Sequence, residues 1–97
     1  MPASRHRYVI TYDIPDDKRR YRVARALKGY GERVQYSVFE CQLTAAQFQK
    51  LWEELARQIK EKEDSVRAYR LCPPCAAWTR TQGTAVIPDD VPEVYIA

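Results

Sequence analysis

The chain has 97 residues, enough for one domain with its own core and too few for two. Hydrophobic residues make up 45% and charged residues 30% of it, with 3 Gly and 6 Pro, a composition that argues against disorder, collagen-like repeats and low complexity. The net charge is +3, and neither an apolar run of roughly 18 residues nor the apolar stretch of a signal peptide is present, so we expect a cytoplasmic protein outside the membrane.

The first predicted element is a strand over residues 8–14, which are rich in β-branched and aromatic side chains and are followed by Pro15. Side chains alternate between the two faces of a strand. The even-numbered residues, all Tyr or Ile, should therefore share one face, and Asp13 should lie on the other face with Val9 and Thr11.

Asp13 is the first candidate functional residue, because it is a carboxylate at the carboxyl end of an otherwise apolar strand. A carboxylate in this place is suited to bind Mg²⁺. The alternative is that Asp13 only turns the chain before Pro15 or pairs with an arginine. Magnesium-dependent phosphodiester chemistry generally uses more than one carboxylate, so we expect such a site at a dimer interface, where two chains would each supply an Asp13.

A basic helix is predicted next, capped by Asp16 or Asp17 and ended by Gly31 in a left-handed conformation. Residues 1–33 hold nine Lys or Arg against four acidic residues, whereas the rest of the chain holds seven against nine. Such a surface binds phosphates through counterion release; the alternative is a solvated helix face whose charges suit the helix dipole. The arginines expected to position a nucleic-acid backbone are Arg19, Arg20, Arg22, Arg25 and Arg33.

Residues 33–43 are extended by composition, and their pattern leaves open whether they form one bent strand or a tight hairpin. Thr44 and Gln47 then fit a capping box that opens a second helix. This helix should end in the charged segment 60–64. Its apolar stripe consists of Phe48, Leu51, Trp52, Leu55 and Ile59.

The end of the chain is less regular. Residues 66–71 predict another strand, and the CxxC pair Cys72-Pro73-Pro74-Cys75 follows it. Cys41 is the only further cysteine and His6 the only histidine, so the sequence favours a proline-stiffened turn with reduced thiols over a zinc or redox site. Residues 84–87 and 94–96 are candidate short strands, and we expect the last to pair on a sheet edge, its own or that of another chain.

The order strand, helix, extended segment, helix, strand predicts an α+β sandwich. It is of ferredoxin-like βαββαβ type if residues 33–43 form a hairpin. We expect one domain over residues 1–97, with both helices on one face of the sheet and the other face available for a second subunit.

Residues 8–41, YVITYDIPDDKRRYRVARALKGYGERVQYSVFEC, closely resemble the N-terminal signature of the CRISPR-associated protein 2 family. The shared features are a strand ending in Tyr-Asp-Ile, a helix start with two aspartates, an arginine-bearing helix, and Arg-Val-Gln leading into Ser-Val-Phe-Glu. Length and element order agree over about the first 71 residues.

This resemblance implies a homodimer that pairs through its sheets, with a core of about residues 7–71 and a C-terminal extension, residues 72–97, that carries an extra strand to the partner. It also implies an Mg²⁺-dependent endonuclease that cuts single-stranded RNA or double-stranded DNA in spacer acquisition and antiviral defence. Carried over by position, Asp13 is the metal ligand and catalytic residue, and Tyr12 supports it. The residues expected to contact or position nucleic acid are Arg20, Arg22, Arg33 and Phe39, with Ser37 as a further contact.

Two functions therefore stand side by side. In the first, paired Asp13 carboxylates hold Mg²⁺ while arginines offset the charge that accumulates on the phosphate. In the second, the dimer is a non-catalytic scaffold that binds nucleic acid and bridges the integrase, CRISPR-associated protein 1. Replacement of Asp13 by Asn separates them, because it abolishes metal-dependent cleavage in the first and leaves nucleic-acid binding intact in the second.

Overall fold

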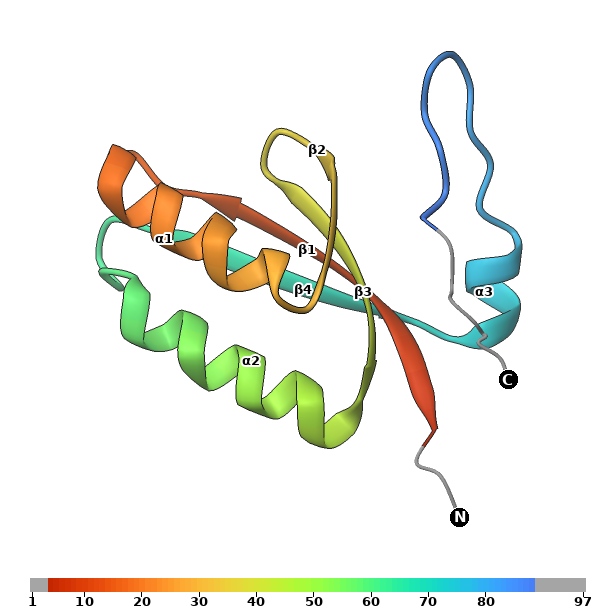
Figure 1. Ribbon diagram of the computed structural model, residues 1–97, viewed down its shortest axis with the longest axis horizontal. Coiled ribbons are helices and arrows are strands. Elements are labelled where there is room, and N and C mark those ends of the chain that lie inside the picture. Colours follow the sequence, from red (N-terminus) through yellow and green to blue (C-terminus); the bar gives the residue numbers. More distant parts are fainter. Residues whose placement is uncertain (1–3, 89–97) are drawn as a thin grey trace.

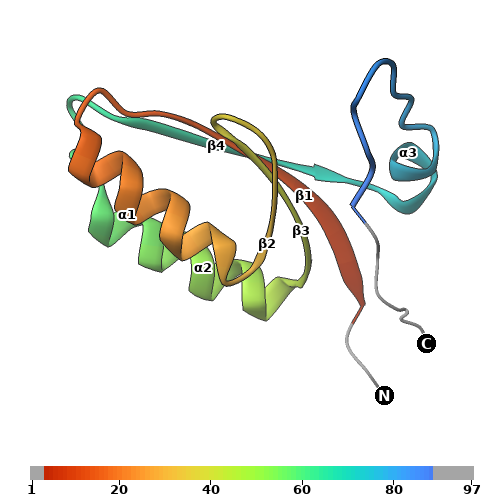
Figure 2. The ribbon, with the colours of Figure 1, turned by 45° about the horizontal axis from the view of Figure 1, so that its top comes forward.

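The computed structural model describes residues 4–88 (Figure 1). Its four strands form one sheet in the order β2-β3-β1-β4, with antiparallel neighbours throughout. Helices α1 and α2 lie on the same face of that sheet (Figures 1 and 2). The predicted ferredoxin-like βαββαβ sandwich is confirmed. The elements are β1 (Arg5–Asp13), α1 (Asp17–Lys28), β2 (Gly31–Gln35), β3 (Val38–Thr44), α2 (Ala45–Gln58), β4 (Ser65–Leu71) and α3 (Pro73–Ala77).

The hydrophobic core lies between the sheet and the two helices. As the alternation in β1 predicts, Tyr8, Ile10 and Tyr12 are buried on the helix-covered face. Phe39 of β3 pairs with Ile10 in the sheet register and is fully buried. The helices contribute the expected stripes, from which Val23, Ala24, Leu27, Leu51 and Leu55 are buried.

Both predicted helix starts are confirmed. The Asp16 side chain caps α1 by accepting a hydrogen bond from the backbone N–H of Arg19 at 2.9 Å. Thr44 and Gln47 form the expected capping box of α2: the Thr44 hydroxyl accepts from the Gln47 N–H at 3.1 Å, and the Gln47 side chain accepts from the Thr44 N–H at 2.9 Å.

Residues 33–43 form a hairpin, which decides the question that the sequence leaves open. The turn consists of Tyr36 and Ser37, and the Ser37 carbonyl accepts a hydrogen bond from the Tyr12 N–H at 3.1 Å. The register between β2 and β3 shifts between Arg33 and Gln35. This irregularity breaks the alternation of the segment and leaves Tyr36 exposed rather than packed with its apolar neighbours.

The predicted role of Gly31 as a left-handed helix end is wrong. Helix α1 ends at Lys28, Gly29 caps it with φ −75°, and Gly31 is the first residue of β2. Gly31 is needed for another reason: a Cβ there would lie 2.5 Å from the Cys41 Sγ and 2.9 Å from the Cys41 Cα. The close approach of β2 to β3, and not a positive φ, excludes a side chain at this position.

The segment after β4 also differs from expectation. Cys72-Pro73-Pro74-Cys75 is not a turn: Cys72 caps the short helix α3, and the two prolines occupy its first turn, where their missing N–H groups are not needed. Residues 84–87 form no strand in the described part of the chain, and residues 94–96 lie outside it. Within residues 4–88, no helix has the length and apolar character needed to cross a membrane.

Candidate functional site

Asp13 is the last residue of β1, and its carboxylate is exposed on the sheet face that neither α1 nor α2 covers. It pairs with Ser65 of β4 in the register. Within residues 4–88 its side chain accepts no hydrogen bond and forms no ion pair, so the alternative of an arginine partner for Asp13 is not realised inside one protomer. A carboxylate left available at the end of a strand is able to bind a cation.

Tyr12 precedes Asp13 and therefore points to the opposite, helix-covered face of the sheet. Its hydroxyl donates a hydrogen bond to the carbonyl oxygen of Tyr36 at 3.4 Å, which joins the end of β1 to the β2–β3 turn. Burial raises the pKa of the Tyr12 phenol above its ordinary value, and the Arg33 guanidinium offsets part of that rise. Tyr12 therefore stays protonated near neutral pH and lies behind Asp13 rather than facing the same solvent.

A small basic recess of about 230 Å³ opens beside Tyr12. Two of the predicted arginines meet in its wall, Arg20 from α1 and Arg33 from β2, although they are thirteen positions apart in the sequence. The Arg33 guanidinium lies over the Phe39 ring, 5.4 Å from its centre. The full lining of the recess is Tyr12, Asp17, Arg20, Tyr21, Ala24, Arg33 and Tyr36.

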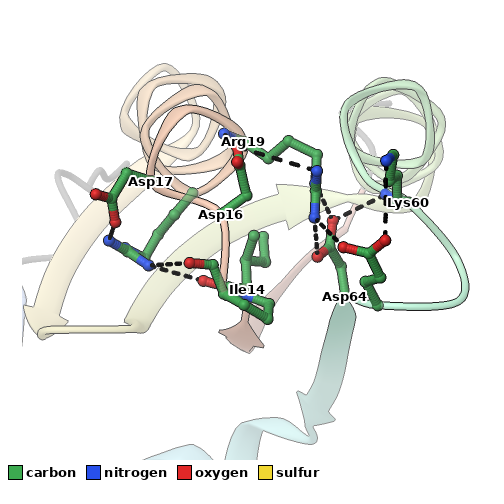
Figure 3. Close-up of polar contacts among 9 residues, drawn as sticks. Ile14, Asp16, Asp17, Arg19, Lys60 and Asp64 are labelled. Carbon is green, nitrogen blue, oxygen red and sulfur yellow. Dashed lines mark hydrogen bonds and ion pairs between the residues drawn. The ribbon is translucent and has the colours of Figure 1, made fainter.

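Arg20 is held in place by its local contacts. Its guanidinium donates to the carbonyl oxygen of Ile14 at 2.8 Å and pairs with Asp17, as Figure 3 shows. The Asp17 carboxylate raises the pKa of the Arg20 guanidinium, so its positive charge is permanent. A fixed cation directly behind the end of β1 is suited to an anionic ligand.

The remaining arginines of α1 divide into two groups. Arg22 and Arg25 are exposed on the helix surface, as a phosphate-binding role requires. Arg19 is not available in the same way: its side chain is 13% exposed and donates to Asp64 at 2.7 and 3.0 Å and to Glu63 at 3.1 Å (Figure 3). These contacts tie α1 to the loop between α2 and β4, and the predicted contact of Arg19 with nucleic acid stays a prediction.

Phe39 and Ser37 also need separate treatment. Phe39 has no exposed surface and lies beneath the Arg33 guanidinium, so its predicted role is to position Arg33, and this stays a prediction. Ser37 lies half-buried in the β2–β3 turn next to Tyr36. Ser37 follows Tyr36, which lines the recess, and the contact of Ser37 with nucleic acid stays a prediction.

Two exposed aromatic residues complete the recess: Tyr21, which the sequence places beside the arginines of the basic helix, and Tyr36, for which the sequence gives no sign of a role in the site. Tyr21 and Tyr36 are 64% and 70% exposed, and both line it. The register shift between Arg33 and Gln35 precedes Tyr36, and the neighbouring residues give no sequence signal for it. Exposed aromatic rings beside arginines provide surfaces on which nucleobases stack.

The carboxylates of residues 4–88 do not make a complete metal site on their own. Within the described residues there is no group of three or more His, Cys, Asp or Glu side chains that could hold an ion. Asp13 fits Mg²⁺ by its oxygen chemistry and its availability, and the further ligands must come from water, substrate or a second chain.

Comparison with known proteins adds to this geometry. The family described as CRISPR associated protein Cas2 matches residues 6–78. The chain belongs to the Cas2 family. A family member from Chloroflexus aurantiacus, named CRISPR-associated endoribonuclease Cas2 1, is 42% identical over 90 residues, which cover 92% of this chain and 97% of the relative.

Solved Cas2 structures agree with the fold. The crystal structure of Streptococcus pyogenes Cas2 superimposes with a TM-score of 0.71 at 38% identity, over 79% of this chain and 99% of that one. A second similar chain comes from a structure described as a partial Cas6-RT-Cas1 and Cas2 complex, with a TM-score of 0.69 at 31% identity, over 78% of this chain and 89% of that one.

Proposed function

We propose that this Cas2 family chain is a metal-dependent endonuclease that cleaves RNA or double-stranded DNA during CRISPR spacer acquisition, and that it acts as a homodimer. The observation that carries the proposal is the exposed Asp13 carboxylate, which has no partner within residues 4–88 and ends the strand that also supports the basic recess. The names of relatives as CRISPR-associated endoribonucleases support the same activity.

The homodimer follows from what one protomer lacks. Within residues 4–88, Asp13 is the carboxylate at the end of β1 on the open sheet face, and Glu40 on the same face is paired with Arg7 at 2.8 Å, whereas phosphodiester cleavage with Mg²⁺ generally uses more than one available carboxylate. The open face also carries half-buried Val9 and Val38 and the exposed ring of Tyr69, apolar surface that a second sheet would cover. A twofold axis across this face would bring two Asp13 side chains together.

The roles of the residues then follow from their positions. Each Asp13 would hold the Mg²⁺, which when bound polarises the phosphate to be cleaved. Arg22 and Arg25 would neutralise the flanking phosphates from the surface of α1. Arg20 and Arg33 would offset negative charge that develops near the end of β1, while the Tyr12 hydroxyl keeps the β2–β3 turn against that strand.

Cleavage by the Asp13→Asn variant tests this proposal. We expect wild-type protein to cut RNA or duplex DNA with Mg²⁺ and not with a chelator, and Asp13→Asn to lose at least about 100-fold in rate with no change in fold. Glu61→Gln, an exposed acid between α2 and β4, is the matched control and should cleave as wild type does. Equal cleavage by Asp13→Asn and wild type would remove Asp13 from the mechanism.

A non-catalytic scaffold is the second candidate, and the similar chain in the partial Cas6-RT-Cas1 and Cas2 complex favours it. In this function the same dimer bridges copies of the CRISPR integrase and holds duplex DNA on its arginines. Wild-type protein that binds duplex and integrase but cleaves nothing with Mg²⁺ would decide for the scaffold. Under that outcome, Asp13→Asn should bind both partners as tightly as wild type does.

A further inference from the structure

The CxxC pair at the end of β4 lies apart from the nucleic-acid site and has no part in the proposed cleavage. Cys72 and Cys75 are both exposed, and their sulfur atoms lie 2.6 Å apart. Cys72 is the N-cap of α3, and Cys75 lies within this helix. Figures 1 and 2 show α3 beyond the end of β4, away from α1 and α2. Two free thiols held this close on the surface form a dithiol that needs almost no movement to be joined.

The backbone of α3 holds the two cysteines on adjacent positions of one helical turn. Pro73 and Pro74 occupy the first turn of α3 and restrict its φ angles. The Cys72 carbonyl accepts from the Ala76 N–H at 2.9 Å, and the Cys72 Sγ accepts from the Cys75 N–H at 3.4 Å. A disulfide is about 2.05 Å long, so the sulfurs need to approach by only about 0.5 Å.

We propose that Cys72 and Cys75 form a thiol–disulfide exchange site that reacts with small-molecule disulfides such as oxidised glutathione and closes to an intramolecular disulfide. The reaction balances as a two-electron exchange. The Cys72 thiolate attacks the small disulfide, forms a mixed disulfide and releases one glutathione thiolate. The Cys75 thiolate then attacks the Cys72 sulfur, forms the Cys72–Cys75 bond and releases the second glutathione, so that the two cysteines lose two protons and two electrons and the disulfide is reduced to two thiols.

The two sulfurs differ in the way that this sequence of steps needs. The contact with the Cys75 thiol, aided by the backbone N–H of Cys75, lowers the pKa of Cys72 below its ordinary value, and the contact between the two thiols raises the pKa of Cys75. Cys72 is therefore the attacking thiol and Cys75 the resolving one. Cys41 provides the contrast: it is 1% exposed in the core, and burial raises its pKa to about 11.

A metal site does not explain the pair as well. Structural zinc takes four ligands in a tetrahedron. The part of the chain that the structure describes contains no group of three or more His, Cys, Asp or Glu side chains. Cys72 and Cys75 thus supply half a ligand set, whereas two thiols are a complete set for exchange.

The test treats the folded full chain with oxidised glutathione, then unfolds it in denaturant so that every remaining thiol is accessible, blocks those thiols with N-ethylmaleimide and reads masses of the protein and its peptides. Wild type should lose two blockable thiols, gain no bound glutathione and lose the mass of two hydrogens, while Cys41 stays blockable. Cys75→Ser should stop with glutathione on Cys72. Cys72→Ser should likewise form no disulfide within the chain.

Three outcomes would overturn the proposal: stable glutathione on wild type, disulfides between chains, or oxidation of Cys41 instead of the pair. Both cysteines are exposed and α3 buries no residue, so the variants should unfold at the wild-type midpoint. If a variant does not fold, the pH dependence of alkylation in the wild-type protein tests which of the two thiols attacks first. Cys72 should become reactive at a lower pH than Cys75, and equal profiles would contradict the asymmetric exchange.

Discussion

The two faces of the sheet differ in what covers them and in what they carry. The face under α1 and α2 holds the core, where Ile10 and Phe39 have no exposed surface. The other face carries Asp13, Arg67 and the half-exposed ring of Tyr69. Because successive residues of one strand point to opposite faces, Tyr12 and Asp13 take part in the core and in the candidate site respectively. The chain can therefore change its chemistry on one face without disturbing the packing on the other.

The largest expected effect separates these faces directly. Phe39→Ala leaves a cavity in the core and should lower the free energy of unfolding by about 3–5 kcal/mol. Tyr69→Ala removes an aromatic ring from the open face and should change it by less than about 0.5 kcal/mol. Urea unfolding of both variants at low protein concentration measures the difference. Similar losses for both would mean that the open face is part of the folding core of the protomer.

The covered face is the part that the sequence predicts well. Alternation in residues 8–14 and the stripe from Phe48 to Ile59 both reflect burial, and burial leaves a periodic pattern. The turn at Tyr36 and Ser37 has only a weak signal, since Ser37 favours turns less strongly than Gly, Asn, Asp or Pro does and Tyr36 is not a typical turn residue. The sequence correctly predicts that β4 ends before Pro73 and Pro74. It predicts a turn there instead of α3, because prolines interrupt most elements but are tolerated in the first turn of a helix.

A second prediction concerns two glycines that frame the start of β2. Gly31→Ala would push a methyl group into the backbone and side chain of Cys41 and should destabilise the protein by about 1–3 kcal/mol. Gly29→Ala is the matched control, because its Cβ would meet only the Ala26 carbonyl, at 3.4 Å, with an ordinary φ of −75°. Thermal unfolding should show Gly29→Ala within about 1 kcal/mol of wild type. A harmless Gly31→Ala would show that β2 can move away from β3.

The candidate site was predicted less completely than the fold, for a reason that Arg19 and Arg20 make clear. They are neighbours on one helix, and composition treats them alike. Arg20 turns to the end of β1, whereas Arg19 meets Asp64, 45 residues later in the chain. Which arginine is exposed depends on that distant acid, and a helix pattern contains no information about it.

Salt dependence of nucleic-acid binding sharpens this division among the arginines. Arg22→Ala removes an exposed cation and should lower the slope of log K against log salt for duplex DNA by about 1. Arg19→Gln should leave the slope unchanged, because its guanidinium is committed to acids of its own chain. Filter binding of duplex DNA at salt concentrations from about 50 to about 200 mM measures both slopes. An equal fall for Arg19→Gln would return that residue to the nucleic-acid surface.

The smallest expected effect is the pH dependence of the contact that keeps Arg19 inside the fold. The Arg19 hydrogen bonds and the Lys60 N–H, at 2.8 Å, lower the pKa of the Asp64 carboxyl below its ordinary value (Figure 3). A carboxyl whose pKa is lower in the folded state stabilises the fold above its unfolded pKa of about 3.9, and this contribution disappears as the pH falls through the folded pKa. Asp64→Asn should therefore show a shallower loss of stability than wild type as the pH falls below about 5.

Chemical denaturation of both proteins across this range isolates the one carboxyl. Hydrogen bonding by the Arg19 N–H also lowers the pKa of Asp16, but Asp16 is present in both proteins and cancels in the comparison. Parallel pH curves for wild type and Asp64→Asn would mean that the Asp64 pKa is the same in the folded and unfolded chains. In that case the contact with Arg19 would not hold the guanidinium, and Arg19 would be as available to phosphate as Arg22 is.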